Sequence, residues 1–212
     1  MIHLYQTTLT QAPSAEAGPP SQAHPQALRC AARTFLVSCL GDFLGKDARD
    51  LALEYLPTGR PVLKDHPELS FSLSHSENQV AVVCSRHVNV GVDLQHKRPF
   101  DERLFSRICT PQEKEGVSQK NAESFYFFWT VKEAAMKCLG LGFQYPMNQL
   151  QTDRALHQVH LLQRKAPSMS LSYPWTFLEF ASFPAPENFA GHVVWAPRPG
   201  DPDYKPNFSL RT

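Results

Sequence analysis

Long apolar runs and an excess of one charge are both absent from this 212-residue sequence. No stretch approaches the roughly 20 consecutive apolar residues that a membrane-spanning helix requires, so a membrane partner is not expected. The 21 Lys and Arg residues nearly balance the 20 Asp and Glu residues, which gives a formal net charge of +1. A protein that binds nucleic acid through bulk positive charge is therefore not expected either.

Cysteine is scarce, and its spacing contains no paired motif. The five cysteines are odd in number and far apart, and no two of them form a Cys-x-x-Cys pair. Neither a disulfide framework nor a cysteine-ligated zinc site is predicted. The beginning of the chain also lacks the basic start and apolar core of a secretory signal, so we expect a cytoplasmic protein.

The composition is that of a globular protein, with 42% hydrophobic and 19% charged residues. The length fits one medium domain or two small ones. The 18 prolines gather near both ends and between predicted elements, which indicates long irregular connections, the first of them over residues 11–25.

Periodicity along the chain predicts two similar α+β halves, residues 1–98 and 99–212. In the first half, apolar spacings of three and four predict a helix from Ala27 that ends at Gly41, before strands over 69–73, 80–84 and 88–94. In the second half, short helical pieces surround Thr110-Pro111, and the strongest helix pattern spans 124–139. Strands are then predicted over 157–163, 175–181 and 192–196, followed by an extended tail.

The helix over 124–139 combines an apolar face with three charged residues near its end. Glu133 and Lys137 lie one turn apart on the same side, which is also typical of a surface ion pair. Lys132 lies at the edge of the apolar face, where an ammonium group is costly unless it meets an anion or reaches solvent. Two lysines and a glutamate beside Trp129 suit a site for phosphate and a metal ion.

A second carboxylate stands at the end of an apolar strand. Asp93 follows Val92, and Gln95 points to the same face as Asp93 because strand side chains alternate. A capping or turn aspartate is the simpler interpretation of Asp93 alone. Asp93 and Glu133 together can share one Mg²⁺, with water and a phosphate completing its shell.

Two short segments have the character of ligand-binding turns. Gly59-Arg60-Pro61 offers a turn with an arginine that can hold a phosphate in bidentate fashion. Ser74-His75 stands where a strand meets a loop, a common place for functional side chains.

Four segments in this order resemble the signatures of Sfp-type 4′-phosphopantetheinyl transferases, of the holo-acyl-carrier-protein synthase superfamily. They are GRPVL (59–63), FSLSHS (71–76), GVDLQ (91–95) and WTVKEAAMKCLG (129–140). The last segment matches the pattern W-x-x-K-E-A-x-x-K-x-x-G throughout, and the resemblance covers roughly residues 27–143.

The resemblance implies a holo-[acyl-carrier-protein] synthase activity. Such a transferase moves the 4′-phosphopantetheine group of coenzyme A onto a serine hydroxyl of an acyl or peptidyl carrier protein and releases adenosine 3′,5′-bisphosphate, with Mg²⁺ as the cation. The implied fold is a pseudo-dimer of two α+β halves, each a small antiparallel sheet packed with a long helix, with the active site and coenzyme A in the cleft between them. Since one chain holds both halves, we expect a monomer.

The resemblance also implies roles for individual residues. The implied metal ligands are Asp93, Glu133 and Gln95. The implied catalytic residues are Glu113, Glu133 and Lys137. Glu113 is the favoured base, with Glu133 or a metal-bound water as the alternatives. The residues implied to bind coenzyme A are Arg29, Gly59, Arg60, Pro61, Ser74, His75, Lys132 and Lys137.

Two departures from the family pattern keep an alternative open. Gln95 stands where many members carry a glutamate, so the metal site has one negative charge fewer. The region before Arg29 is poor in lysines that could hold the 3′-phosphate of coenzyme A. The alternative is a catalytically weakened relative that binds coenzyme A or a carrier protein without transfer. A Mg²⁺-dependent nuclease fits poorly, because the spacing of Glu133 and Lys137 is helical and the net charge is nearly neutral.

Overall fold

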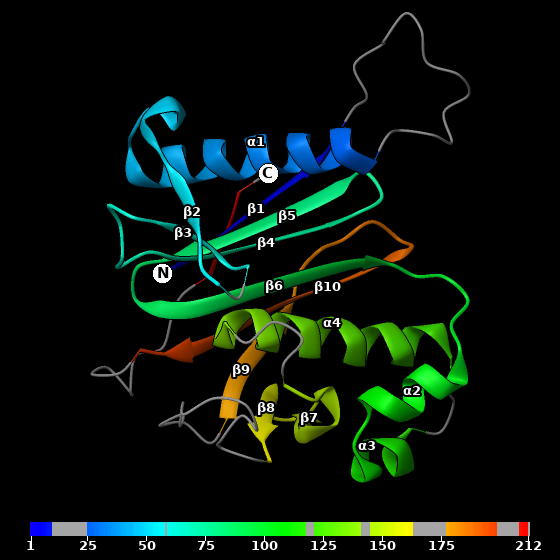
Figure 1. Ribbon diagram of the computed structural model, residues 1–212. Helices are drawn as coiled ribbons and strands as arrows, with labels where there is room; N and C mark the ends of the chain where they lie inside the picture. Colours follow the sequence, from blue (N-terminus) through cyan, green and yellow to red (C-terminus); the bar gives the residue numbers. More distant parts are fainter. Residues whose placement is uncertain are drawn as a thin grey trace, which may run out of the picture.

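The computed structural model describes residues 1–9, 25–57, 59–117, 121–140, 145–162, 177–198 and 208–211. In this part of the chain, two β-sheets lie between two long helices, so that four layers follow one another from α1 to α4 (Figure 1). None of the helices described is both long enough and apolar enough to cross a membrane.

The first sheet has the strand order β11-β1-β5-β4. Its strands are β1 (Ile2–Thr8), β4 (Ser70–Ser76), β5 (Gln79–Ser85) and β11 (Phe208–Arg211). Helix α1 (Pro25–Leu44) covers the outer face of this sheet, where Leu36 and Leu40 join one apolar cluster with Val82. A short 3-10 helix, η2 (Ala48–Asp50), and a hairpin of β2 (Leu53–Tyr55) and β3 (Pro61–Leu63) connect the helix to β4.

The second sheet has the order β6-β10-β9-β8-β7, and its strand pairs are antiparallel. Its strands are β6 (Val88–His96), β7 (Leu150–Asp153), β8 (Gln158–Leu161), β9 (Phe177–Ser182) and β10 (Phe189–Pro197). Helix α4 (Ala122–Leu139) packs on its outer face. The remaining helices are α2 (Glu102–Ile108), α3 (Pro111–Gly116) and the 3-10 helix η4 (Met147–Gln149).

The inner faces of the two sheets share an apolar cluster, in which Leu4 and Val83 of the first sheet pack with Val92 and Val193 of the second. Strands β5 and β6 are therefore buried on both faces, one against the other sheet and one against a helix. Burial on two faces explains why their sequences are nearly continuous apolar runs rather than alternating ones.

Side chains, rather than a main-chain ladder, join β4 to β6 where the two sheets meet. The hydroxyls of β4 accept hydrogen bonds of 2.9 to 3.2 Å from main-chain N–H groups of β6. The pairs are Ser70 with Val90, Ser72 with Val92, Ser74 with Leu94, and Ser76 with His96. We call these four pairs the serine seam. The seam holds the strand that carries Asp93 against the strand that carries His75.

The α+β class, with one long helix on each sheet, agrees with the sequence prediction. The helix start predicted at Thr110-Pro111 is confirmed, and the structure adds a capping box there, since the Thr110 hydroxyl and the Glu113 carboxylate cap α3 reciprocally. The predicted end of the first helix at Gly41 is wrong. The helix continues to Leu44, and the next glycine, Gly45, adopts the left-handed conformation (φ 66°) that commonly ends helices.

Strand exchange between the predicted halves was not evident from the sequence. β1 was not predicted, and the expected extended tail contains β11, which pairs in parallel with β1. β6 belongs to the first predicted half but pairs with β10 in the second sheet. Each half thus contributes one strand to the other sheet, while the division at residue 98 and the pseudo-dimer stay predictions. The loop expected over 11–25 lies almost entirely outside the described residues.

Candidate active site

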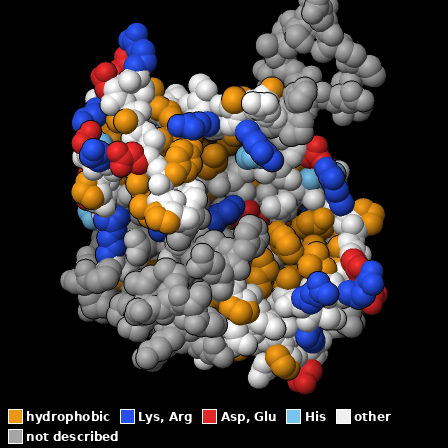
Figure 2. Space-filling view, viewed as in Figure 1, with side chains coloured by type: hydrophobic (Ala, Val, Ile, Leu, Met, Phe, Trp, Pro, Cys, Tyr) orange, Lys and Arg blue, Asp and Glu red, His pale blue; other side chains and the backbone are white. Residues whose placement is uncertain are grey.

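A cavity of about 530 Å³ lies between α1, the β2–β3 hairpin, β4 and the C-terminal end of α4. Lys and Arg side chains lie along the upper part of this face of the molecule (Figure 2). The cationic and potentially cationic side chains that line the cavity are Arg29, Arg33, Arg60, His75 and Lys137. No Asp or Glu is among its described lining residues, and the apolar walls include Tyr55 and Phe71. Such a cavity favours a multiply charged anion with an apolar part.

His75 shows how strongly positive this cavity is. Burial, followed by the charges of Lys137 and Arg29, lowers the pKa of the imidazole below its ordinary value. The ring is therefore neutral at neutral pH, and an anion in the cavity would favour its protonation.

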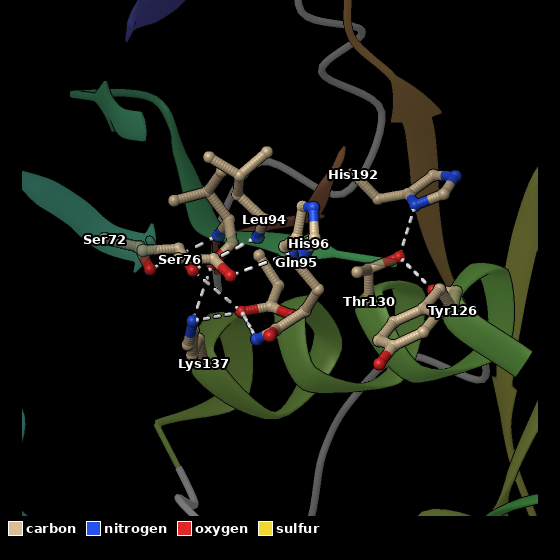
Figure 3. Close-up of polar contacts among 12 residues, drawn as sticks. Ser72, Ser76, Leu94, Gln95, His96, Tyr126, Thr130, Lys137 and His192 are labelled. Carbon is tan, nitrogen blue, oxygen red and sulfur yellow. Dashed lines mark hydrogen bonds and ion pairs between the residues drawn. The ribbon is translucent and has the colours of Figure 1, made fainter. Parts of the chain in front are cut away.

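Asp93 lies on β6, is 1% exposed, and contacts Lys137, which lines the cavity. Its Oδ1 accepts hydrogen bonds from the Ser74 hydroxyl at 2.8 Å and from the Lys137 ammonium at 2.7 Å. The side-chain amide of Gln95 donates to Oδ2 at 3.2 Å, and Figure 3 shows Gln95 and Lys137 approaching the same carboxylate. Partners from β4, α4 and β6 thus hold the Asp93 carboxylate in place.

Glu133 lies on α4, one turn before Lys137, and is 7% exposed. Its Oε1 is buried and, within the described part of the chain, has no hydrogen-bond partner. Burial, and then the charge of Asp93, raises the pKa of Glu133 to about 7, although Lys137 acts in the opposite direction. A buried carboxylate with a free oxygen near a second carboxylate fits a site for a divalent cation.

The available donors suit Mg²⁺. Asp93 and Glu133 supply carboxylate oxygens and Gln95 supplies an amide, whereas the described residues contain no cluster of three or more His, Cys, Asp or Glu side chains placed for a metal ion. Mg²⁺ usually binds through one or two carboxylates and keeps its other positions for water and substrate phosphates. The donor set therefore resembles a Mg²⁺ site shared with a phosphate rather than a closed protein cage.

The close contact between α4 and β6 positions these groups. Gly91 faces the helix, and a Cβ at this position would overlap the Ala134 carbonyl oxygen and the Cys138 amide nitrogen. Because the helix lies this close, the Lys137 ammonium also reaches the Val92 carbonyl oxygen at 3.0 Å. Glycine at this point of the GVDLQ segment is thus required by packing.

Comparison with known proteins points to the same family as the sequence. A sequence model described as the 4′-phosphopantetheinyl transferase superfamily matches residues 89–190, which include Asp93, Glu133 and Lys137. Over these residues the chain is similar to this superfamily. The Sfp-type resemblance seen in the sequence is thereby confirmed.

Several curated phosphopantetheinyl transferases are similar to this chain. HetI of Nostoc sp. is 33% identical over 121 residues, which cover 53% of this chain and 51% of the relative. Sfp of Bacillus subtilis is 26% identical over 117 residues, covering 53% and 50%. The L-aminoadipate-semialdehyde dehydrogenase-phosphopantetheinyl transferase of Mus musculus is 29% identical over 121 residues, covering 49% and 39%. The chain spans about half the length of the curated relatives it matches.

The structure brings most residues with an implied role in this transferase family to one place. The residues expected to bind coenzyme A that line the cavity are Arg29, Gly59, Arg60, Pro61, His75 and Lys137. Arg33 also lines it and was missed by the sequence analysis, although it follows Arg29 by four residues, the spacing that places two side chains on one helix face. Ser74 does not line the cavity, since its hydroxyl contacts Asp93 and the Leu94 amide instead.

Glu113 and Lys132 lie apart from this cavity, as a buried ion pair. The Lys132 ammonium contacts Glu113 Oε2 at 2.5 Å and the carbonyl oxygen of Ile108 at 2.7 Å, and the two side chains are 0% and 1% exposed. Main-chain N–H groups of Thr110 and Thr152 donate to the two oxygens of Glu113. Both charges are satisfied inside the second half, so this geometry does not support Glu113 as the base or Lys132 as a coenzyme A ligand, and both roles stay predictions.

Proposed function

We propose that this protein transfers the 4′-phosphopantetheine group of coenzyme A to a serine hydroxyl of an acyl or peptidyl carrier protein, in a Mg²⁺-dependent reaction that releases adenosine 3′,5′-bisphosphate. The observation that carries the proposal is the continuity of the cationic cavity with the buried carboxylates. Lys137 lines the cavity and also bonds to Asp93, so a phosphate in the cavity and a metal ion at the carboxylates would be neighbours.

In this proposal, the nucleotide part of coenzyme A occupies the cavity. Arg29, Arg60, His75 and Lys137 would bind its phosphates, and the apolar wall at Tyr55 would contact the adenine. Phosphoryl transfer depends mainly on positioning and on neutralising negative oxygens. Lys137 is placed to stabilise the charge that develops on the departing bisphosphate.

Asp93, Glu133 and Gln95 would hold the Mg²⁺. When bound, the ion would neutralise charge on the pyrophosphate oxygens. With Glu113 occupied in its ion pair, Glu133 is the described carboxylate best placed to receive the serine proton, directly or through water. Burial and charge in the site support these roles.

The proposal includes a monomer that acts in the cytoplasm, without nucleic acid or membrane. Residues of both predicted halves line the cavity, which supports a site complete within one chain. The five cysteines are free, as expected for a reducing compartment.

The second candidate is a relative that binds coenzyme A or a carrier protein but transfers little or nothing. The observation that favours it is Gln95, whose side chain donates to Asp93 and adds no negative charge for a metal ion. Substitution of Gln95 by glutamate would then increase activity at limiting Mg²⁺.

The experiment is intact-mass analysis of apo carrier proteins incubated with the protein, coenzyme A and Mg²⁺. We expect a gain of one phosphopantetheine group that is lost with EDTA and with the Asp93→Ala variant. Coenzyme A binding without any mass gain across fatty-acid, polyketide and peptide-synthetase carriers would overturn transfer and favour the second candidate.

A further inference from the structure

A buried hydrogen bond joins His192 of β10 to Thr130 of α4, close to the candidate active site. His192 Nδ1 lies 2.7 Å from the Thr130 hydroxyl oxygen (Figure 3). The threonine is 0% exposed and the histidine 5% exposed. Thr130 stands at an unspecified position of the pattern W-x-x-K-E-A-x-x-K-x-x-G, and His192 lies outside all four segments that carry the family resemblance. The resemblance therefore gives neither residue a role.

The Thr130 hydroxyl determines which nitrogen of His192 carries the proton. Its oxygen lies 2.7 Å from the main-chain carbonyl oxygen of Tyr126, and a carbonyl only accepts, so the hydroxyl proton points there. Nδ1 of the imidazole therefore carries a proton and donates it to the threonine oxygen. Burial, followed by the charge of Arg154, lowers the pKa of His192 to about 4, so the ring is neutral at neutral pH.

This hydrogen bond is formed on the sheet face that also carries Asp93. His192 is the cross-strand partner of Asp93, and directly opposed residues of antiparallel strands have their side chains on the same face. Helix α4 covers this face, since its Lys137 ammonium reaches Asp93 at 2.7 Å. Two side-chain contacts thus join α4 to opposed positions of β6 and β10.

On the helix, Glu133 lies between these two contacts. Thr130 and Lys137 are seven residues apart, which is nearly two turns, or about 10 Å along the axis. Figure 3 shows their contacts well apart on α4. Glu133 follows Thr130 by three residues and precedes Lys137 by four, and both spacings place side chains on one side of a helix.

The position of Glu133 depends on how α4 is held. Glu133 Oε1 is buried and has no hydrogen-bond partner among the described residues, so its own contacts do not fix this oxygen. Of the two contacts that hold the helix, the one made by Lys137 involves a residue of the coenzyme A cavity, where the ammonium would also bind a phosphate. Thr130 and His192 are not among the described lining residues of that cavity, and their contact is internal to the protein.

We propose that Thr130 and His192 are positioning residues for the metal site. Their hydrogen bond fixes α4 against β10, which keeps Glu133 near enough to Asp93 for both carboxylates to bind one divalent cation. This inference rests on the proposed function, in which Mg²⁺ is held by these carboxylates. Thr130 and His192 act on the site through the backbone of α4.

Three substitutions of buried threonines test the proposal. Thr130→Val keeps nearly the same side-chain volume and removes the hydroxyl, whereas Thr130→Ser is the conservative variant that retains it. Thr152→Val is the matched control, because Thr152 is also buried, at 6% exposed, and its hydroxyl has no hydrogen-bond partner among the described residues. Melting temperatures establish that each variant is folded at the temperature of the binding measurements.

Binding of Mn²⁺ in place of Mg²⁺, followed by electron paramagnetic resonance, reports on the site without any transfer. We expect Thr130→Val to raise the Kd for Mn²⁺ at least about fivefold, equivalent to about 1 kcal/mol, with the Kd for coenzyme A in EDTA unchanged. Thr130→Ser and Thr152→Val are expected to keep the Kd of the unaltered protein.

The possible outcomes separate the inference from the proposed function. A lower melting temperature of Thr130→Val with an unchanged Kd for Mn²⁺ would assign the hydrogen bond to stability alone and overturn the inference. Absence of Mn²⁺ binding by the unaltered protein would overturn it as well. Transfer by the unaltered protein is measured separately, and its absence with every carrier would overturn the proposed function, whatever the Mn²⁺ affinities are.

The tautomer of His192 provides an independent spectroscopic test. Long-range proton–nitrogen NMR spectra distinguish a ring protonated at Nδ1 from one protonated at Nε2, and the His192 signals are assigned by their loss in His192→Asn. We expect protonation at Nδ1 in the unaltered protein and in Thr130→Ser, and loss of this fixed tautomer in Thr130→Val. Protonation at Nε2 alone in the unaltered protein would contradict the proposed contact.

Discussion

At the scale of single residues, the two carboxylates of the site differ in how their charges are satisfied. Asp93 receives a hydroxyl, an amide and an ammonium group, whereas Glu133 retains a buried oxygen that has no partner among the described residues. Paired carboxylates in different surroundings commonly have different tasks. Here Asp93 forms a fixed anionic position, and Glu133 gains most from an added cation.

Lys137→Ala tests the link between the cavity and Asp93. We expect kcat to fall at least about a hundredfold, because the variant loses the positive charge at both the pyrophosphate and Asp93. The fold should survive, since the Lys137 side chain is 30% exposed. Transfer rates measured by intact mass, with Lys64→Ala as an exposed control, check this expectation, and an undiminished rate would remove Lys137 from the mechanism.

Glu133 predicts a pH dependence of stability in the metal-free protein. The pKa of Glu133 in the folded protein is about 7, above its ordinary 4.5. Below pH 4.5 the carboxyl is therefore protonated in both the folded and the unfolded state, and it does not change the free energy of unfolding. As pH rises towards 7, only the unfolded state ionises, and the free energy of unfolding falls by up to about 3 kcal/mol. We expect Glu133→Gln to abolish this loss in urea titrations with EDTA at pH 5 and pH 8. Equal pH dependence in both proteins would contradict the raised pKa of Glu133.

At the scale of elements, the distance between α4, which carries Glu133 and Lys137, and the neighbouring strand β6 depends on a single residue of that strand. Because Gly91 of β6 has no Cβ, α4 lies so close to this strand that a Cβ added at position 91 would overlap the backbone of the helix. Backbone atoms cannot rotate away as a flexible side chain can, so the helix itself would have to move.

Gly91→Ala should therefore destabilise the protein by about 2–3 kcal/mol and lower transfer activity by displacing Lys137. Gly116→Ala is the control, because no atom of the described residues lies within 4 Å of the Cβ that it would add. Urea denaturation of both variants provides the measurement. Equal stabilities would show that α4 shifts freely on the sheet.

The sequence predicts such elements best where one local pattern determines them. The periodicity of α4 and the alternation around Asp93 were sufficient to predict that this helix and this strand contribute residues to one site. The pair of Glu113 and Lys132 was not predictable in this way, because its burial depends on α3, β7 and α4 meeting. A charged residue in a motif looks the same in sequence whether it faces a ligand or another charge.

At the scale of the whole molecule, the two ends of the described chain lie in one sheet. β1 stands between β5 and β11, and its parallel pairing with β11 joins positions about 200 residues apart. Pairing over this distance has no local signal, which is why neither strand was predicted as part of a sheet.

Removal of residues 208–212 should leave β1 as an edge strand. We expect a lower melting temperature and faster amide exchange in β1, because its N–H groups towards β11 lose their partners. Amide exchange in α4, which packs on the other sheet, should change little under native conditions. Unchanged exchange in β1 would show that β11 contributes no protection there.

The serine seam also determines how the two sheets can move. A hydroxyl rotates about its own bond and accepts from a range of directions, whereas a strand ladder keeps a fixed geometry. The amides of Val90, Val92, Leu94 and His96 therefore depend on four independent contacts rather than on one cooperative ladder. Replacing Ser72 by alanine should expose a single amide, that of Val92, to deuterium exchange, so the junction between the two sheets would open one contact at a time.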